Sequence, residues 1–181
     1  MCVTRAGEPR HPQASLNRQT TIFVGAAPDS SSAILGLDSF ARSLPNAKRL
    51  LGSFRFEWGQ QAASDLIDQG VTAGSIVTAA DVIALGVIAG IQARGYRIPE
   101  DFRVIGFDDI GVSFLAHPAL TSVRQPVNQM TRTIVEIVLG DIAGHGVAPR
   151  NARRVFKPDL MNRDSSPTRT VSRTWWTGRV Y

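Results

Sequence analysis

The chain of 181 residues is 43% apolar with ordinary numbers of Gly and Pro, which predicts one globular domain with a sizeable core and argues against a disordered chain. A single cysteine, Cys2, excludes an internal disulfide framework, and three scattered histidines, His11, His117 and His145, lack the spacing of metal ligands. The first residues carry charges and prolines where a signal peptide is apolar, and no run approaches the roughly 18 apolar residues of a membrane span, so we expect a cytoplasmic protein without membrane contact.

The net charge of +5 is distributed unevenly along the chain. Residues 21–144 carry nine basic and twelve acidic side chains, a net charge of −3, so the flanks carry +8. A groove that follows nucleic-acid phosphates needs Lys and Arg clustered on the folded surface. The acidic body therefore argues against direct DNA or RNA binding by this chain.

The predicted elements alternate between strand and helix. Strands or extended segments are expected at 20–25, 48–54, 75–78, 104–107, 120–123 and 154–161, and helices at 33–44, 57–69, 81–94 and 127–143. Short β-branched runs indicate the strands, apolar residues at spacings of three and four indicate the helices, and Gly70 and Gly95 end two of the helices. This order predicts an α/β fold with a mainly parallel sheet flanked by helices on both faces.

Two adjacent carboxylates, Asp108 and Asp109, follow the predicted strand 104–107. In open α/β folds, ligands bind outside the carboxyl ends of the strands. We expect one rim to be lined by the loops that leave Gly25, Phe54, Thr78 and Phe107. Two interpretations stay open: one acid caps a turn while the other is solvated, or one accepts hydrogen bonds from ligand hydroxyls or amines while the other braces the loop. The second would favour a cationic or polyhydroxylated ligand.

Five segments stand in a characteristic order: GAAPDSSSA, RFEWGQQAASDLIDQG, TAADVIALGVIAGIQARGYRIPEDFRVIGFDDI, PALTSVRQPVNQM and FKPDLMNRDSS. Over about 145 residues this succession resembles the latter part of the LacI/GalR transcriptional regulators, which is more specific than a likeness of fold alone. The resemblance implies a periplasmic-binding-protein-like (type I) subdomain with an incomplete second subdomain. It also implies a homodimer that senses a small polar effector, such as a sugar.

The resemblance further implies parts that this chain lacks. In the family a helix-turn-helix headpiece comes first, and no candidate for one stands before Thr21, so we expect DNA contact only through a headpiece missing from this chain. Most of the amino-terminal subdomain, roughly one hundred residues, is also missing, which would leave the helix after Pro126 without its usual cover. A fragment, a truncated product and an oligomer that shields this face all remain open. We expect an irregular extension over 1–19, a sensor domain over 20–163 and an irregular tail over 164–181.

The resemblance also implies ligand contacts at particular positions. Asp108 matches a carboxylate that binds ligand hydroxyls, Phe54 an aromatic that stacks on a sugar or base ring, and Gln125 a polar hinge residue. Two ligand-contact positions depart from the family, since Gly36 replaces a frequent Arg and Ala80 a usual Asn. These departures argue against sugar recognition in the manner common to the family, and they leave open a pocket that is altered, emptied or unused.

For Phe54, plain core packing remains an alternative, and we expect Asp81 to cap its own helix. Two functions from other classes also stay open. A solute-binding module of a transport system is disfavoured because no export signal is present. A flavodoxin-like phosphoryl-transfer domain could hold Mg²⁺ at Asp108 and Asp109, but it lacks a matching third acid and a lysine. The leading hypothesis is a ligand sensor that is no enzyme and has no cofactor or metal.

Overall fold

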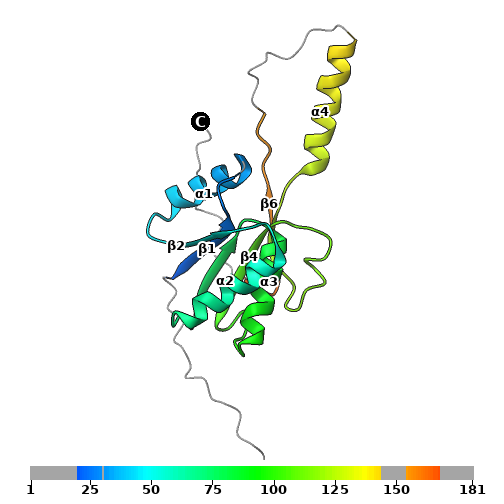
Figure 1. Cartoon of the computed structure of the whole chain (residues 1–181). Coiled ribbons are helices and arrows are strands. Elements are labelled where there is room, and N and C mark those ends of the chain that lie inside the picture. Colours follow the sequence, from blue (N-terminus) through cyan, green and yellow to red (C-terminus); the bar gives the residue numbers. More distant parts are fainter. Residues whose placement is uncertain (1–19, 30, 144–153, 168–181) are drawn as a thin grey trace, which may run out of the picture.

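The computed structural model of the protein describes residues 20–29, 31–143 and 154–167. Its strands are β1 (Thr21–Ala26), β2 (Lys48–Gly52), β3 (Gly74–Thr78), β4 (Phe102–Asp108), β5 (Thr121–Arg124) and β6 (Asp159–Met161). They form one sheet in the order β2-β1-β3-β4-β5-β6 (Figure 1). Strands β1 to β5 run parallel, and β6 pairs antiparallel with β5 at the edge. The predicted α/β fold with a mainly parallel sheet is confirmed.

The helices lie close to their predicted positions. They are α1 (Ser31–Ser43), α2 (Phe56–Asp68), α3 (Asp81–Ala93) and α4 (Val127–Ile142). Gly70 and Gly95 follow α2 and α3 with φ values of 82° and 79°, in the left-handed region that glycine adopts without a steric penalty. These two glycines therefore end the helices as the sequence predicts.

The hydrophobic core lies between one face of the sheet and the helices α2 and α3. Alternate residues of the strands point into it, among them Ile22, Val24, Ile76 and Val104. From the helices come Ala62, Ala63, Leu66, Ile83, Val87 and Ile91. The two helices touch through glycines, since a Cβ at Gly86 would lie 2.0 Å from the carbonyl oxygen of Phe56. This close approach fixes α2 against α3.

Helix α1 covers part of the opposite face. Phe23 of β1 lies between Ile22 and Val24, so its side chain points away from the core that they enter. It stacks on Phe40 of α1 with ring centroids 4.7 Å apart. Helices thus lie on both faces of the sheet, as predicted.

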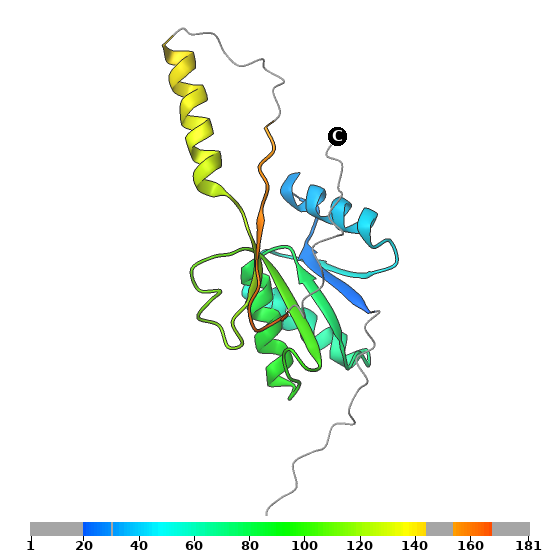
Figure 2. The same ribbon diagram turned by 180° about the vertical axis from the view of Figure 1, so that it is seen from behind.

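Helix α4 stands away from the sheet and from the helices α1, α2 and α3 (Figures 1 and 2). None of its residues is buried. Seven of its large apolar side chains are between 37% and 78% exposed: Val127, Ile134, Val135, Ile137, Val138, Leu139 and Ile142. The expectation that this helix presents an uncovered apolar face is confirmed for the residues that the structure describes. No helix in the described ranges has the length and apolarity needed to cross a membrane.

The ends of the chain are described only in part. The predicted irregular extension over 1–19 lies outside the described residues, as does 168–181 of the predicted tail. Within 164–167, Ser165 is fully buried, and its hydroxyl donates to the carbonyl oxygen of Val104 at 2.7 Å. The segment after β6 is therefore packed against β4.

We predict that Gly86→Ala destabilises the fold, because the added methyl group meets the backbone of Phe56. Overpacking of this kind costs about 1–3 kcal/mol. Gly36→Ala is the matched control, since nothing lies within 4 Å of a Cβ on this exposed helical glycine; it should stabilise α1 by up to about 1 kcal/mol. Guanidinium chloride unfolding measures both changes, and equal unfolding midpoints would contradict the packing described for α2 and α3.

Candidate ligand-binding site

The carboxyl ends of the five parallel strands meet at one edge of the sheet, which we call the lip. Asp108 is the last residue of β4 and pairs in register with Arg124, the last residue of β5. Asp109 directly follows β4, and Gln125 directly follows β5. The parallel order therefore places both carboxylates at the edge where open α/β sheets bind ligands.

Asp108 is half-buried, and its carboxylate accepts one hydrogen bond, from Nε2 of Gln125 at 2.7 Å. Burial raises the pKa of Asp108 above its ordinary value; the hydrogen bond from Gln125 opposes this shift, and the nearby charge of Asp81 adds to it. The second oxygen of this carboxylate has no hydrogen-bond partner among the described residues, so it can accept hydrogen bonds from a ligand. The structure thus brings together two of the residues that the sequence singled out.

Asp109 has a different environment, although it is the next residue. Its side chain is only 3% exposed and lies between two guanidinium groups, 2.6 Å from Arg163 and 2.5 Å from Arg124. Burial alone would raise the pKa of Asp109, but the hydrogen bonds from Arg163 and Arg124 outweigh it and hold the pKa below its ordinary value. Asp109 therefore braces the junction of β4 and β5 and is not a solvated surface acid.

The backbone at both aspartates is strained. Their φ angles are 105° at Asp108 and 55° at Asp109, in a region that L-residues rarely adopt. A conformation of this kind costs about 1–3 kcal/mol for each residue and persists only where its surroundings enforce it. Neighbouring contacts must therefore hold this turn in place.

Asp81 does not cap its own helix, contrary to the sequence-based expectation. The N-cap residue is Ala80, and it makes no side-chain hydrogen bond to the helix end. The carboxylate of Asp81 reaches the loop after β4, where it accepts bonds from the backbone N–H of Ile110 at 2.9 Å and the hydroxyl of Ser113 at 2.5 Å. Ser122 of β5 donates to its other oxygen at 2.6 Å. A carboxylate that accepts hydrogen bonds from three distant donors does not also cap the N-terminus of its own helix here.

The other predicted positions are spread over the domain. Phe54 lies two residues beyond β2 and is 43% exposed, so plain core packing is wrong for it. It is three strand spacings, roughly 14 Å, from β4 along the lip. The methyl group of Ala80 is buried in the hydrophobic core, and Gly36 is exposed on α1 beside open space.

Three further side chains that shape the lip were not predicted from the sequence. Trp58 donates from its indole N–H to the carbonyl oxygen of Gly25 at 3.0 Å, and its ring lies where a Cβ at Gly52 would be, within 2.3 Å. It thereby ties together the ends of β1 and β2. Arg163 and Arg124 hold Asp109. Little in the sequence points to these two arginines, because each lies far along the chain from Asp109 and meets it only through the pairing of strands.

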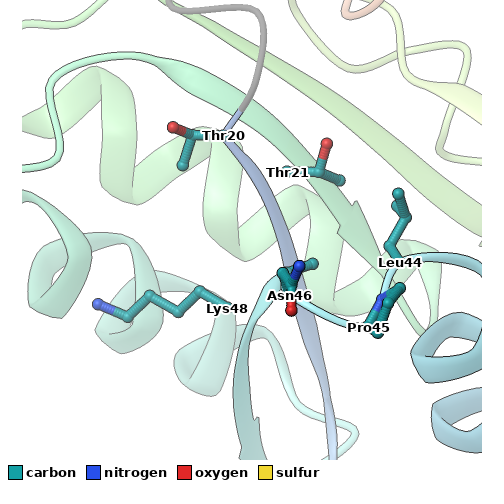
Figure 3. A pocket seen from close by; sticks show the side chains of 7 residues that line it. Thr20, Thr21, Leu44, Pro45, Asn46 and Lys48 are labelled. Atoms are coloured by element: carbon teal, nitrogen blue, oxygen red, sulfur yellow. The ribbon is translucent and has the colours of Figure 1, made fainter.

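Two hollows on the described residues lie away from these side chains. One, of about 370 Å³, is lined by Thr20, Thr21, Leu44, Pro45, Asn46, Ala47 and Lys48 at the amino ends of β1 and β2 (Figure 3). The other, of about 410 Å³, lies between α1 and the edge strand β2. Neither touches Asp108, Phe54 or Gln125. These two hollows therefore do not include the candidate ligand-contact side chains of the lip.

The comparison with known families agrees with this fold. The family model for a periplasmic binding protein-like domain matches residues 19–166. The chain belongs to this family. Among curated relatives, the HTH-type transcriptional regulator MalR of Streptomyces coelicolor is 40% identical over 113 residues, which cover 62% of this chain and 32% of the relative. The resemblance to LacI/GalR regulators is confirmed, and the chain spans about a third of the length of the curated relatives it matches.

Solved structures of regulators show the same architecture. The complex of the transcriptional regulator CelR with cellobiose superimposes with a TM-score of 0.74 at 26% identity, over 83% of this chain and 47% of that one. A dimeric Lac repressor has a TM-score of 0.75 at 24% identity, over 86% of this chain and 58% of the repressor chain. The type I periplasmic-binding-protein-like fold predicted from the sequence is therefore shown.

We predict that Asp109→Asn removes an acid-sensitive part of the stability. Because the folded pKa of Asp109 lies below the ordinary aspartate value of 3.8, its ion pairs contribute fully above that pH and are lost as the pH falls through the folded pKa. The variant should be less stable by about 1–3 kcal/mol at neutral pH. Unfolding free energies of the two proteins, measured from pH 7 to pH 2, should begin to approach one another only below about pH 4 and should meet below the folded pKa. A difference that stays constant with pH would contradict the assignment.

Proposed function

We propose that this chain is the ligand-sensing part of a LacI-type transcriptional regulator, within residues 20–163, and that it binds a small, polar, sugar-like effector at the lip. The observation that carries this proposal is the division of labour between the two aspartates. Asp109 is fully engaged by arginines, while Asp108 is held by Gln125 with acceptor capacity left over. A carboxylate presented in this way suits the hydroxyl groups of a polyol or sugar.

The aromatic ring of Phe54 supports the same class of ligand. It is exposed on the lip, where an apolar ring face can stack on the C–H face of a sugar ring. Asp108 and Phe54 are roughly 14 Å apart by strand spacing, which favours an effector larger than a single hexose. Cellobiose, the ligand named for CelR, has two sugar rings. Because Gly36 and Ala80 offer no polar side chain, Asp108 and Gln125 carry the polar recognition from this subdomain.

In this proposal the lip forms one wall of the effector site, and the family resemblance implies that a second subdomain forms the opposite wall. Helix α4 leads away from the lip with its apolar side chains exposed, as a segment that packs on such a subdomain would. An effector between the walls would favour one relative arrangement and so alter operator affinity through a DNA-binding headpiece. The sensor body itself, with its net charge of −3 over residues 21–144, is not suited to hold DNA phosphates.

The two alternative functions receive less support. A magnesium-dependent phosphoryl-transfer site would need Asp109 as a ligand, but both of its oxygens are bound by guanidinium groups. In the ranges that the structure describes, no three His, Cys, Asp or Glu side chains are grouped to hold a metal ion. A transport-associated binding module shares this fold, but the relatives are named as transcriptional regulators.

We predict that Asp108→Asn weakens effector binding at least about tenfold, because it replaces a charged acceptor by a neutral amide. Asp109→Asn should weaken binding less, since Asp109 acts on the loop and has no free acceptor. Isothermal titration calorimetry with cellobiose, and with maltose and lactose as comparison sugars, measures both. The opposite ranking of the two variants, or binding of no disaccharide by the wild-type chain, would contradict the proposal.

The pH dependence offers a control within the same experiment. Hydroxyl donors bind the ionised carboxylate, so affinity should fall as the pH drops through the raised pKa of Asp108, above the 3.8 of an ordinary aspartate. In Asp108→Asn this part of the pH dependence should vanish.

We further propose that the chain forms a homodimer through the loop between β4 and β5. This loop exposes Val112, Phe114 and Leu115 by 52%, 59% and 70%. These three side chains lie close together in one loop, and an exposed apolar cluster of this kind suits contact with a second copy of the chain. The dimeric state of the structurally similar Lac repressor supports this.

We predict that Leu115→Glu weakens self-association at least about tenfold, because it places a charge in an apolar contact. Gln60→Glu, which adds the same charge at an exposed position of α2, should leave it unchanged. Sedimentation velocity over a concentration series measures the dissociation constant. A wild-type chain that stays monomeric, or equal effects of the two variants, would rule out this interface.

A further inference from the structure

Asp81 is a fully buried carboxylate that neither the proposed ligand contact nor the core explains. It is the first residue of α3, where the helix dipole favours a negative charge. Its oxygens accept hydrogen bonds from Ile110, Ser113 and Ser122, all of which belong to the loop after β4 or to β5. A buried carboxylate with three donors is a strong and specific anchor.

These hydrogen bonds enclose the strained turn. Ile110 directly follows Asp109, so its N–H is fixed at one end of the turn. At the side of the turn, the hydroxyl of Ser122 accepts from the N–H of Asp109 at 3.0 Å while it donates to Asp81. Asp81 is therefore linked to Asp109 by two routes: through the N–H of the next residue, Ile110, and through the hydroxyl of Ser122. The positive φ angles at Asp108 and Asp109 lie inside this frame.

The strand beneath is shaped to admit the carboxylate. Gly106 of β4 lies under Asp81, and a Cβ there would come within 2.1 Å of Oδ1. Only glycine leaves room for the carboxylate to cross β4 and reach β5. The sequence G-F-D-D therefore combines the gap for the anchor with the residues that the anchor holds.

We propose that Asp81 is a positioning residue, whose carboxylate holds the Asp108–Asp109 turn so that Asp108 is presented at the lip. The same hydrogen bonds hold the start of the loop that exposes Val112, Phe114 and Leu115. Effector contact and the apolar loop are therefore parts of one anchored unit. The effect on effector binding rests on the proposed function, whereas the effect on the turn does not.

Amide hydrogen–deuterium exchange of the whole chain tests the anchor without any ligand. In Asp81→Ala, exchange at residues 108–113 should rise at least about tenfold, while the amides of β1 and β3 keep their protection. Asp81→Asn, which retains one acceptor oxygen, should give a smaller rise at the same residues. Unchanged exchange at 108–113, or a uniform rise over the whole domain in both variants, would overturn the proposal.

Two further variants separate the anchor from general stability. Gly106→Ala keeps the carboxylate but displaces it, so it should reproduce the exchange pattern of Asp81→Ala, and the double variant should add little to either. Ser165→Ala is the matched control, because Ser165 is equally buried and binds Val104 and Thr121 at the other end of the same strands. It should raise exchange there and leave 108–113 unchanged. The same response at 108–113 in Ser165→Ala as in Asp81→Ala would also overturn the proposal.

Titration with cellobiose then tests the consequence for binding. If Asp81 acts through Asp108, Asp81→Asn weakens binding in the wild-type background but has little effect in Asp108→Asn. A merely structural defect would weaken binding equally in both backgrounds. If the wild-type chain binds no cellobiose, this choice of effector fails, and the exchange experiment still decides the role of Asp81.

Discussion

The junction of β4 and β5 depends on the buried carboxylate of Asp81. A charge without water around it is tolerated only where donors and a helix dipole replace the lost hydration. α3 supplies the dipole, and the loop and β5 supply the donors. Because all of these groups must be present together, helix, loop and strand form one unit. This need for donors explains why the start of the loop is bound to Asp81 and why β4 has a glycine at position 106. The position of Asp108 at the lip follows from the same contacts.

The two neighbouring aspartates show how environment assigns different roles to one residue type. Asp109 faces two arginines, and its pKa is lowered, so it stays ionised and serves the structure. Asp108 is half-buried beside a neutral amide, and its pKa is raised, which leaves an ionisable acceptor at the lip. Positive φ angles at both residues turn the chain sharply enough to send their side chains into these separate surroundings.

Apolar side chains are exposed on helix α4 and on the loop between β4 and β5. Helix α4 contributes no side chain to the core, yet it is rich in isoleucine and valine, which are often buried in proteins. The core made by α2, α3 and the sheet is complete without it. The proposed function assigns the exposed side chains of α4 to contacts with a second subdomain.

The sequence by itself determined the order of strands and helices, the helix ends at Gly70 and Gly95, and the edge at which Asp108 lies. These follow from local periodicity, from glycine's conformational freedom and from the direction of parallel strands. Only the tertiary structure decided that Asp109 meets Arg163, that Ala80 is in the core, and that Asp81 binds donors 29 to 41 residues away instead of its own helix end. Those partners are set by which strands become neighbours, and hydrogen bonds between distant residues leave no periodic trace in the sequence.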